Sequence, residues 1–209
     1  MKPILFSAEM VRAIQDLRKT QTRRIVKPKR NSRCRMSLFN AIAHISGKWF
    51  GVDFNNVPFI NDLIEQPKCK PGDILWVRET WAPCATIDSW IDDKKLYAYK
   101  TDYSEKEVVW KWHPSIFMPR EAVRIFLRVT NVRVERLHDI TENDARNEGV
   151  KDPYDYQEPS YYNQPHVRGM EINKSAFAGL WDSLNAKRGY GWQTNCWVWV
   201  YEFERVSEA

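Results

Sequence analysis

The stretch Ile14-Gln-Asp-Leu-Arg-Lys-Thr-Gln-Thr-Arg-Arg-Ile-Val-Lys-Pro-Lys-Arg30 combines the end of an amphipathic helix with the start of an extended segment. Met10, Ile14 and Leu17 are spaced for one buried helical face. The β-branched residues within 22–26 favour a strand. An amine and two hydroxyls lie where the two elements join: Lys19, Thr20 and Thr22. A junction of this kind holds polar side chains at the end of a rigid element, which is typical of a binding or catalytic site.

Positive charge is concentrated in the same part of the chain. Nine basic residues and no acidic one lie between Arg18 and Arg35, whereas the whole chain of 209 residues carries a net charge of +5. Clustered lysine and arginine residues favour an anionic partner such as nucleic acid. No apolar run approaches the roughly 18 to 20 residues that span a bilayer. The charge therefore favours nucleic acid or another polyanion as partner, and the sequence predicts no membrane span.

Cysteine and histidine usage gives no sign of a metal site. The four cysteines are widely scattered, and the four histidines show no ligand spacing. We therefore expect no metal, no cofactor and free thiols in a reducing cytoplasm. The residues concerned are Cys34, Cys69, Cys84, Cys196, His44, His113, His138 and His166.

Hydrophobic periodicity and turn signals predict an α+β chain in which strands predominate. Helices are expected over residues 8–17, capped by Ser7, over 142–148, capped by Thr141, and over 172–185. Strands are expected over 2–6, 22–26, 74–77, 96–100, 123–129, 132–134 and 197–206, with Thr130-Asn131 separating two of them and a hairpin around 49–54. Strands without a βαβ repeat indicate a small mixed sheet or barrel, with helices across its openings.

Four segments, in matching order, resemble the ASCH domain of the PUA-like β-barrel superfamily. They are Arg18-Lys-Thr-Gln-Thr-Arg-Arg24, Pro71-Gly-Asp-Ile-Leu-Trp-Val-Arg-Glu79, Leu137-His-Asp-Ile-Thr-Glu-Asn-Asp-Ala-Arg-Asn-Glu-Gly149 and the closing Trp-rich strand. The chain is most similar to the longer phage and prophage members. The resemblance implies a single PUA-like domain over residues 1–209, with insertions at about 27–69, 82–120 and 151–170. Most members have glycine before Arg-Lys-Thr, where this chain has Leu17.

The resemblance also implies an activity. Short bacterial ASCH proteins include amidohydrolases that remove the acetyl group from N4-acetylcytidine. Their catalytic lysine, threonine and glutamate match Lys19, Thr22 and Glu148 of this chain. Substrate or RNA is expected to contact further residues in or beside the matching segments, namely Arg18, Thr20, Arg23, Arg24, Arg78 and Glu79.

These residue types fit amide hydrolysis. A threonine hydroxyl becomes a nucleophile when a neighbouring base takes its proton. A lysine acts as that base when burial or nearby positive charge lowers its pKa, and adjacent arginines supply such charge. The reaction would pass through an acyl-Thr22 intermediate. Glu148 would orient Lys19, hold the nucleobase amino group or carry a proton to the leaving amine.

Three other functions fit the same sequence. The chain is alternatively a non-catalytic module for RNA or a modified base, a ribonuclease of the ASCH type, or a phage accessory protein that binds a host protein. The oligomeric state is left open. Core packing is expected for Trp76, Trp181, Trp197 and Trp199. Among the tryptophans, those of the insertions are the better candidates for base stacking, namely Trp49, Trp90, Trp110 and Trp112.

Overall fold

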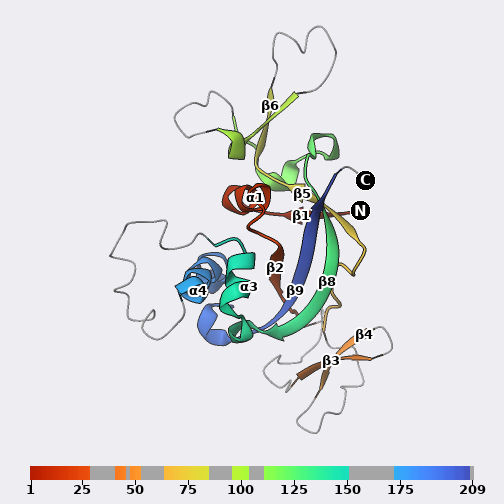
Figure 1. Cartoon of the computed structure of the whole chain (residues 1–209), viewed down its shortest axis with the longest axis vertical. Helices are drawn as coiled ribbons and strands as arrows, with labels where there is room; N and C mark the ends of the chain where they lie inside the picture. Colours follow the sequence, from red (N-terminus) through yellow and green to blue (C-terminus); the bar gives the residue numbers. More distant parts are fainter. Residues whose placement is uncertain are drawn as a thin grey trace. The chain divides into compact units, whose positions relative to one another are not determined.

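The computed structural model describes residues 1–28, 41–45, 48–52, 64–84, 96–103, 111–150 and 172–207. Figure 1 shows these elements coloured along the sequence. Several predictions lie outside the described residues. They concern the basic residues 29–35, most of the first insertion, the loop at 151–170, and the stacking roles of Trp90 and Trp110.

The chain divides into two compact units. Unit 1 comprises Met1–Thr20, Pro71–Thr130 and Phe203–Ala209, and unit 2 comprises Gln21–Lys70 and Asn131–Glu202. Each unit is thus built from segments that are far apart in the sequence.

The fold is α+β, with one sheet of five strands in the order β1-β5-β8-β9-β2. β1 runs parallel to β5, β5 is antiparallel to β8, and β2 is antiparallel to β9. β1 and β2 are the two edges of this order, so the described strands form an open sheet and not the closed barrel that we expected. The strand bounds are β1 Lys2–Leu5, β2 Gln21–Ile25, β5 Ile74–Arg78, β8 Phe126–Arg136 and β9 Trp197–Val206.

Two hairpins accompany the sheet. In unit 2, β3 (Ala41–Ile45) pairs with β4 (Lys48–Val52), which confirms the predicted hairpin but begins it earlier. In unit 1, β6 (Trp81–Cys84) pairs with β7 (Leu96–Tyr99), the strand predicted at 96–100. Both hairpins lie in or beside the regions that we interpreted as insertions.

β8 corrects the predicted break at Thr130-Asn131, because one strand continues through both residues. Both residues are exposed although consecutive strand residues point to opposite faces, so both faces of β8 meet solvent here, and neither glycine nor proline is present to turn the chain. The polar pair was therefore wrongly interpreted as a turn.

β9 is buried on both faces in unit 2. Trp197, Trp199 and Tyr201 belong to one apolar cluster, and Val198 and Val200 belong to another. This separation follows from the two-residue period of a strand and confirms the predicted sidedness. Trp49 packs edge-on against Trp199, with ring centroids 5.2 Å apart, so it contributes to the first cluster.

Helices α3 (Glu142–Asn147) and α4 (Ile172–Asn185) contribute Ala145, Phe177, Ala178 and Trp181 to the second cluster in unit 2. Phe177 and Trp181 of α4 are buried, Trp181 as predicted, whereas Leu184 of the same helix is 47% exposed. Short 3-10 helices complete the fold: η2 Lys100–Asp102, η3 Ser115–Phe117, η4 Arg120–Ala122, η5 Leu137–Asp139, η8 Ala186–Arg188 and η9 Trp192–Thr194.

Helix α1 (Ala8–Gln15) in unit 1 is capped by Ser7, whose hydroxyl accepts from the Met10 N–H at 3.4 Å. The helix ends in a Schellman motif. The Leu17 N–H donates to the Ile14 carbonyl at 3.1 Å, and the next N–H donates to the Ala13 carbonyl at 2.9 Å. Leu17 has φ +60° and is 71% exposed, so the prediction that it is buried was wrong. A left-handed residue at this position favours glycine, which is the residue that most ASCH domains have there.

Replacing Leu17 with glycine is expected to stabilise unit 1 by about 1 kcal/mol, because a side chain in the left-handed region is strained and this one is largely exposed. Urea denaturation measures the change. Leu17→Ala removes the side chain beyond Cβ but keeps the strain, so it should leave the stability nearly unchanged. A glycine variant no more stable than the alanine variant would contradict the prediction.

Candidate functional site

Lys19 lies in unit 1, directly after the Schellman motif. Its side chain is buried, with the residue 2% exposed, and its ammonium is 5.6 Å from the centroid of the Phe6 ring. Its N–H donates to the Ala13 carbonyl at 2.9 Å. Full burial of a lysine is rare in proteins. Lys19 therefore differs from a typical surface lysine in its environment.

The neighbours of Lys19 in unit 1 are more exposed. Arg18 forms an ion pair with Asp16 at 2.9 Å. Thr20 is exposed at its side chain, and its carbonyl accepts from the Phe203 N–H at 2.8 Å. Arg18 and Thr20, both expected to contact substrate or RNA, are thus more accessible to solvent than Lys19 between them.

Thr22 lies in β2 of unit 2, opposite Tyr201 of β9, and is 2% exposed. Strand alternation places Thr22 and Arg24 on one face of β2, and Gln21 and Arg23 on the other. The strand therefore presents a hydroxyl and a guanidinium on one side of the sheet, and an amide and a second guanidinium on the side of α3.

Glu148 is the C-cap residue of α3 and is 4% exposed. The helix begins with a reciprocal capping box between Thr141 and Asp144, and the Glu148 N–H donates to the Asp144 carbonyl at 2.9 Å. Gly149 follows with φ +82°. The predicted cap, helix and terminating glycine are confirmed, and together they determine where the Glu148 backbone lies.

Arg23 connects β2 to Glu148. Its Nη1 donates to Glu148 Oε1 at 3.0 Å, and its Nε and Nη2 donate to Glu135 Oε1 at 3.0 and 2.5 Å. The Arg23 side chain has no exposed surface, and its guanidinium lies 5.7 Å from the Phe177 ring centroid. The donors of Arg23 thus bind carboxylates of its own chain.

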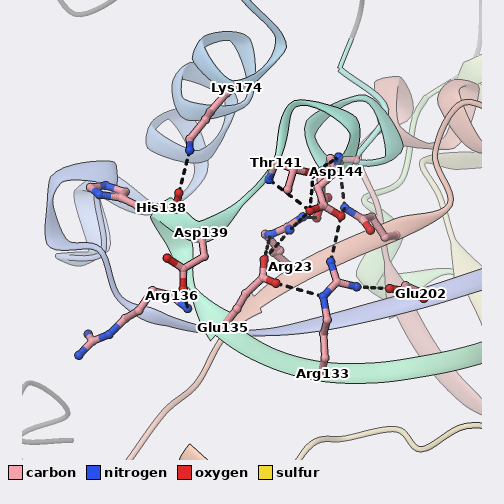
Figure 2. Close-up of polar contacts among 12 residues, drawn as sticks. Arg23, Arg133, Glu135, Arg136, His138, Asp139, Thr141, Asp144, Lys174 and Glu202 are labelled. Atoms are coloured by element: carbon pink, nitrogen blue, oxygen red, sulfur yellow. Dashed lines mark hydrogen bonds and ion pairs between the residues drawn. The ribbon is translucent and has the colours of Figure 1, made fainter. Parts of the chain in front are cut away.

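A second arginine extends this network, as Figure 2 shows. Arg133 donates to Glu135 Oε2 at 3.0 Å and to Asp144 Oδ1 at 2.9 Å, and it also pairs with Glu202. Burial opposes the charge of Arg133, but its carboxylate partners outweigh this effect and raise its pKa. We call the full set the β2–α3 network; its members are Gln21, Arg23, Arg133, Glu135, Asp144, Glu148 and Glu202.

Charge in the β2–α3 network is unbalanced. Two guanidiniums face four carboxylates, which leaves a formal charge of −2. A cluster of this sign does not attract a phosphate group. On this face of β2 the geometry therefore favours an internal role for Arg23 over contact with RNA.

Arg24, also in unit 2, experiences a different environment. Burial lowers the pKa of its guanidinium, while the charge of Glu148 raises it. An arginine remains protonated despite such a shift. Arg24 thus supplies a permanent positive charge that interacts with the predicted catalytic carboxylate.

Glu79 lies in unit 1 and is 1% exposed. Arg124 donates two hydrogen bonds of 2.9 Å to its carboxylate, from Nε to Oε1 and from Nη2 to Oε2. The Thr101 hydroxyl donates to the same carboxylate at 2.9 Å, and Asp102 pairs with Arg124 at 2.6 Å. Arg78 beside it donates to the Ile116 carbonyl and stacks on Trp76 at 4.6 Å.

Sequence reasoning missed the partners that hold these residues. Arg133 and Glu135 alternate along β8, a spacing that places both side chains on one face. This signal was available, but it does not identify Arg23 as the partner. Arg124 carried no local signal, because its contact with Glu79 depends on the pairing of segments distant in sequence.

Within the described residues, none of the helices has both the length and the apolar composition of a membrane span. The same part of the chain contains no group of three or more histidine, cysteine or acidic side chains arranged to hold a metal ion.

Comparison of the chain with models of protein families, with curated proteins and with solved structures found no match. Membership of the ASCH family thus stays a prediction from the four sequence segments.

Glu142 joins α3 to α4 within unit 2. Its carboxylate accepts from the Asn173 N–H at 2.8 Å, the Asn173 side chain at 2.6 Å and the Lys174 N–H at 3.0 Å. It therefore caps the first turn of α4. Burial opposes the ionised form, but these hydrogen bonds outweigh it and lower the pKa of Glu142 below its usual 4.5.

Replacing Glu142 with glutamine is expected to destabilise the protein by about 1 kcal/mol at pH 7, allowing for solvent screening. Because the folded-state pKa is lowered, this contribution is fully present above pH 4.5 and disappears as the pH falls through the folded-state value. Urea denaturation at pH 7 and pH 3 should show the difference from wild type shrinking at pH 3. Glu204→Gln, on an exposed residue, is the control; an equal difference at both pH values would contradict the assignment.

Proposed function

We propose that this chain is an ASCH-type amidohydrolase that removes the acyl group from N4-acetylcytidine or a related acylated nucleoside. We also propose that its five-stranded sheet is the core of a PUA-like fold. The proposal rests on the sequence segments described above. One structural observation supports it: all three residues predicted to be catalytic are buried, with Lys19 and Thr22 each 2% exposed and Glu148 4% exposed.

Burial of these three side chains is informative because lysine, threonine and glutamate are usually exposed. Removing an amine or a carboxylate from water costs free energy unless partners compensate for it. Proteins place such groups inside when packing, ion pairing or chemistry requires them, and perturbed buried groups cluster at functional sites. Residues selected only because they match a motif would not all be expected to be buried.

The proposed reaction has two steps. Thr22 Oγ attacks the acetyl carbonyl carbon while the Lys19 amine accepts the hydroxyl proton. The bond between the carbonyl carbon and N4 then breaks, N4 receives the proton that Lys19 had accepted, and cytidine leaves acetyl-Thr22. Water attacks this ester, releasing acetate and restoring the Thr22 hydroxyl. Glu148 assists proton transfer or holds the amino group of the base.

The test is incubation of the protein with N4-acetylcytidine and, separately, with acetylated RNA, followed by mass-resolved chromatography. Formation of cytidine and acetate in equal amounts supports the proposal. Intact nucleoside with shortened RNA would indicate a ribonuclease instead. RNA that is bound without any product, with an affinity that falls steeply with salt, would indicate a binding module.

A further inference from the structure

The predicted catalytic carboxylate of unit 2 has an internal partner. Glu148 ends α3, where the partial negative charge of the helix C-terminus disfavours an anion, and it is 4% exposed. A carboxylate in such a place needs compensation by positive charge and hydrogen bonds. Arg23 Nη1 provides both at a distance of 3.0 Å from Glu148 Oε1.

Arg23 is itself held in one orientation. The Glu135 carboxylate accepts from its Nε and Nη2, Asp144 Oδ2 lies 3.6 Å from Nη2, and the Phe177 ring lies beside the guanidinium. Glu135 is in turn fixed by Arg133. The planar guanidinium has donors at fixed angles, so the contacts on Nε and Nη2 determine where Nη1 points.

We infer that Arg23 is a positioning residue, which holds the Glu148 carboxylate in one orientation for the reaction. This inference rests on the proposed function. It gives Arg23 a role different from the predicted contact with substrate or RNA. Arg136 of β8 lies outside the β2–α3 network: its side chain donates to the Asn195 carbonyl at 3.2 Å and lies over the Trp197 ring, 4.3 Å from a centroid of that ring. Arg136 therefore serves as a matched control.

The test is a double-mutant cycle with Arg23→Gln and Glu148→Gln, with kcat and KM measured on N4-acetylcytidine. Each single variant is expected to lose kcat by about 100-fold, the lower range for a proton-transfer group, with KM little changed. The double variant should have a kcat less than about 3-fold below that of Glu148→Gln alone, because Arg23 acts through Glu148. Arg23→Lys keeps the positive charge but lacks the planar set of guanidinium donors, so its kcat should lie between that of the wild type and that of Arg23→Gln.

Urea denaturation provides a readout that does not depend on activity. Glu148→Gln should lower the urea midpoint of the wild type by more than it lowers that of Arg23→Gln, where the hydrogen bond between the two side chains is already absent. Arg136→Gln should keep kcat within about 3-fold of wild type, even where it lowers the midpoint, if positioning, and not general stability, governs activity.

Three results would overturn the inference. A folded Arg23→Gln variant with wild-type kcat would leave Arg23 a structural role only, while the proposed function would stand. Losses that multiply in the double variant would show that Arg23 acts independently of Glu148. Absence of turnover by the wild-type chain would overturn the proposed function and this inference together, whatever the urea midpoints show.

Discussion

A Lys19→Arg variant is expected to lose amide hydrolysis by roughly 100- to 10,000-fold, the range measured when a general base is removed. Arginine keeps the positive charge but stays protonated, so it cannot accept the Thr22 proton. The measurement is the rate of cytidine release from N4-acetylcytidine. The same variant should still bind RNA if Lys19 serves only as a cation, so one substitution separates catalysis from simple charge recognition.

Substitutions of Thr22 complete this test. Thr22→Val preserves shape and removes the nucleophile, so it should be as inactive as Lys19→Arg. Thr22→Ser keeps a hydroxyl and should retain measurable turnover. Because both positions are buried, circular dichroism must first establish that each variant is folded. Folded Lys19→Arg and Thr22→Val variants with wild-type turnover would refute the proposed roles.

An Arg124→Met variant is expected to destabilise the protein by about 3 kcal/mol, the largest effect on stability that we predict. Arg124 supplies two hydrogen bonds to Glu79, which is 1% exposed. Without the guanidinium, the buried carboxylate keeps only the Thr101 hydroxyl among the donors described here. Urea denaturation at neutral pH measures the loss.

Two further variants make that result specific. Arg124→Met combined with Glu79→Gln should recover part of the loss, because no buried charge is then left without a partner. Arg128→Met removes an arginine whose ion pair with Glu204 is more than half exposed on both sides, so it should change stability by less than about 0.5 kcal/mol. Equal effects of Arg124→Met and Arg128→Met would contradict the buried-pair interpretation.

Local features of the fold were predictable from the sequence. The alternation of large aromatic and valine residues in β9, the Thr141 cap of α3 and the apolar face of α4 each depend on neighbours within a few residues. Leu17 was mispredicted because its apolar side chain continued the helical spacing, whereas the backbone had already left the helix. The Thr130-Asn131 pair was mispredicted because an exposed stretch of strand resembles a turn in composition.

The sequence by itself determined where α1, α3 and α4 begin and which polar residue types stand beside them. The tertiary structure alone decided how those residues are partnered. Arg23 and Glu148 are separated by 125 positions, and Glu79 and Arg124 by 45. Spacing and propensity report only on contacts within a few residues. Strand order and helix docking bring distant charges together, and desolvation then makes each buried charge dependent on its partner.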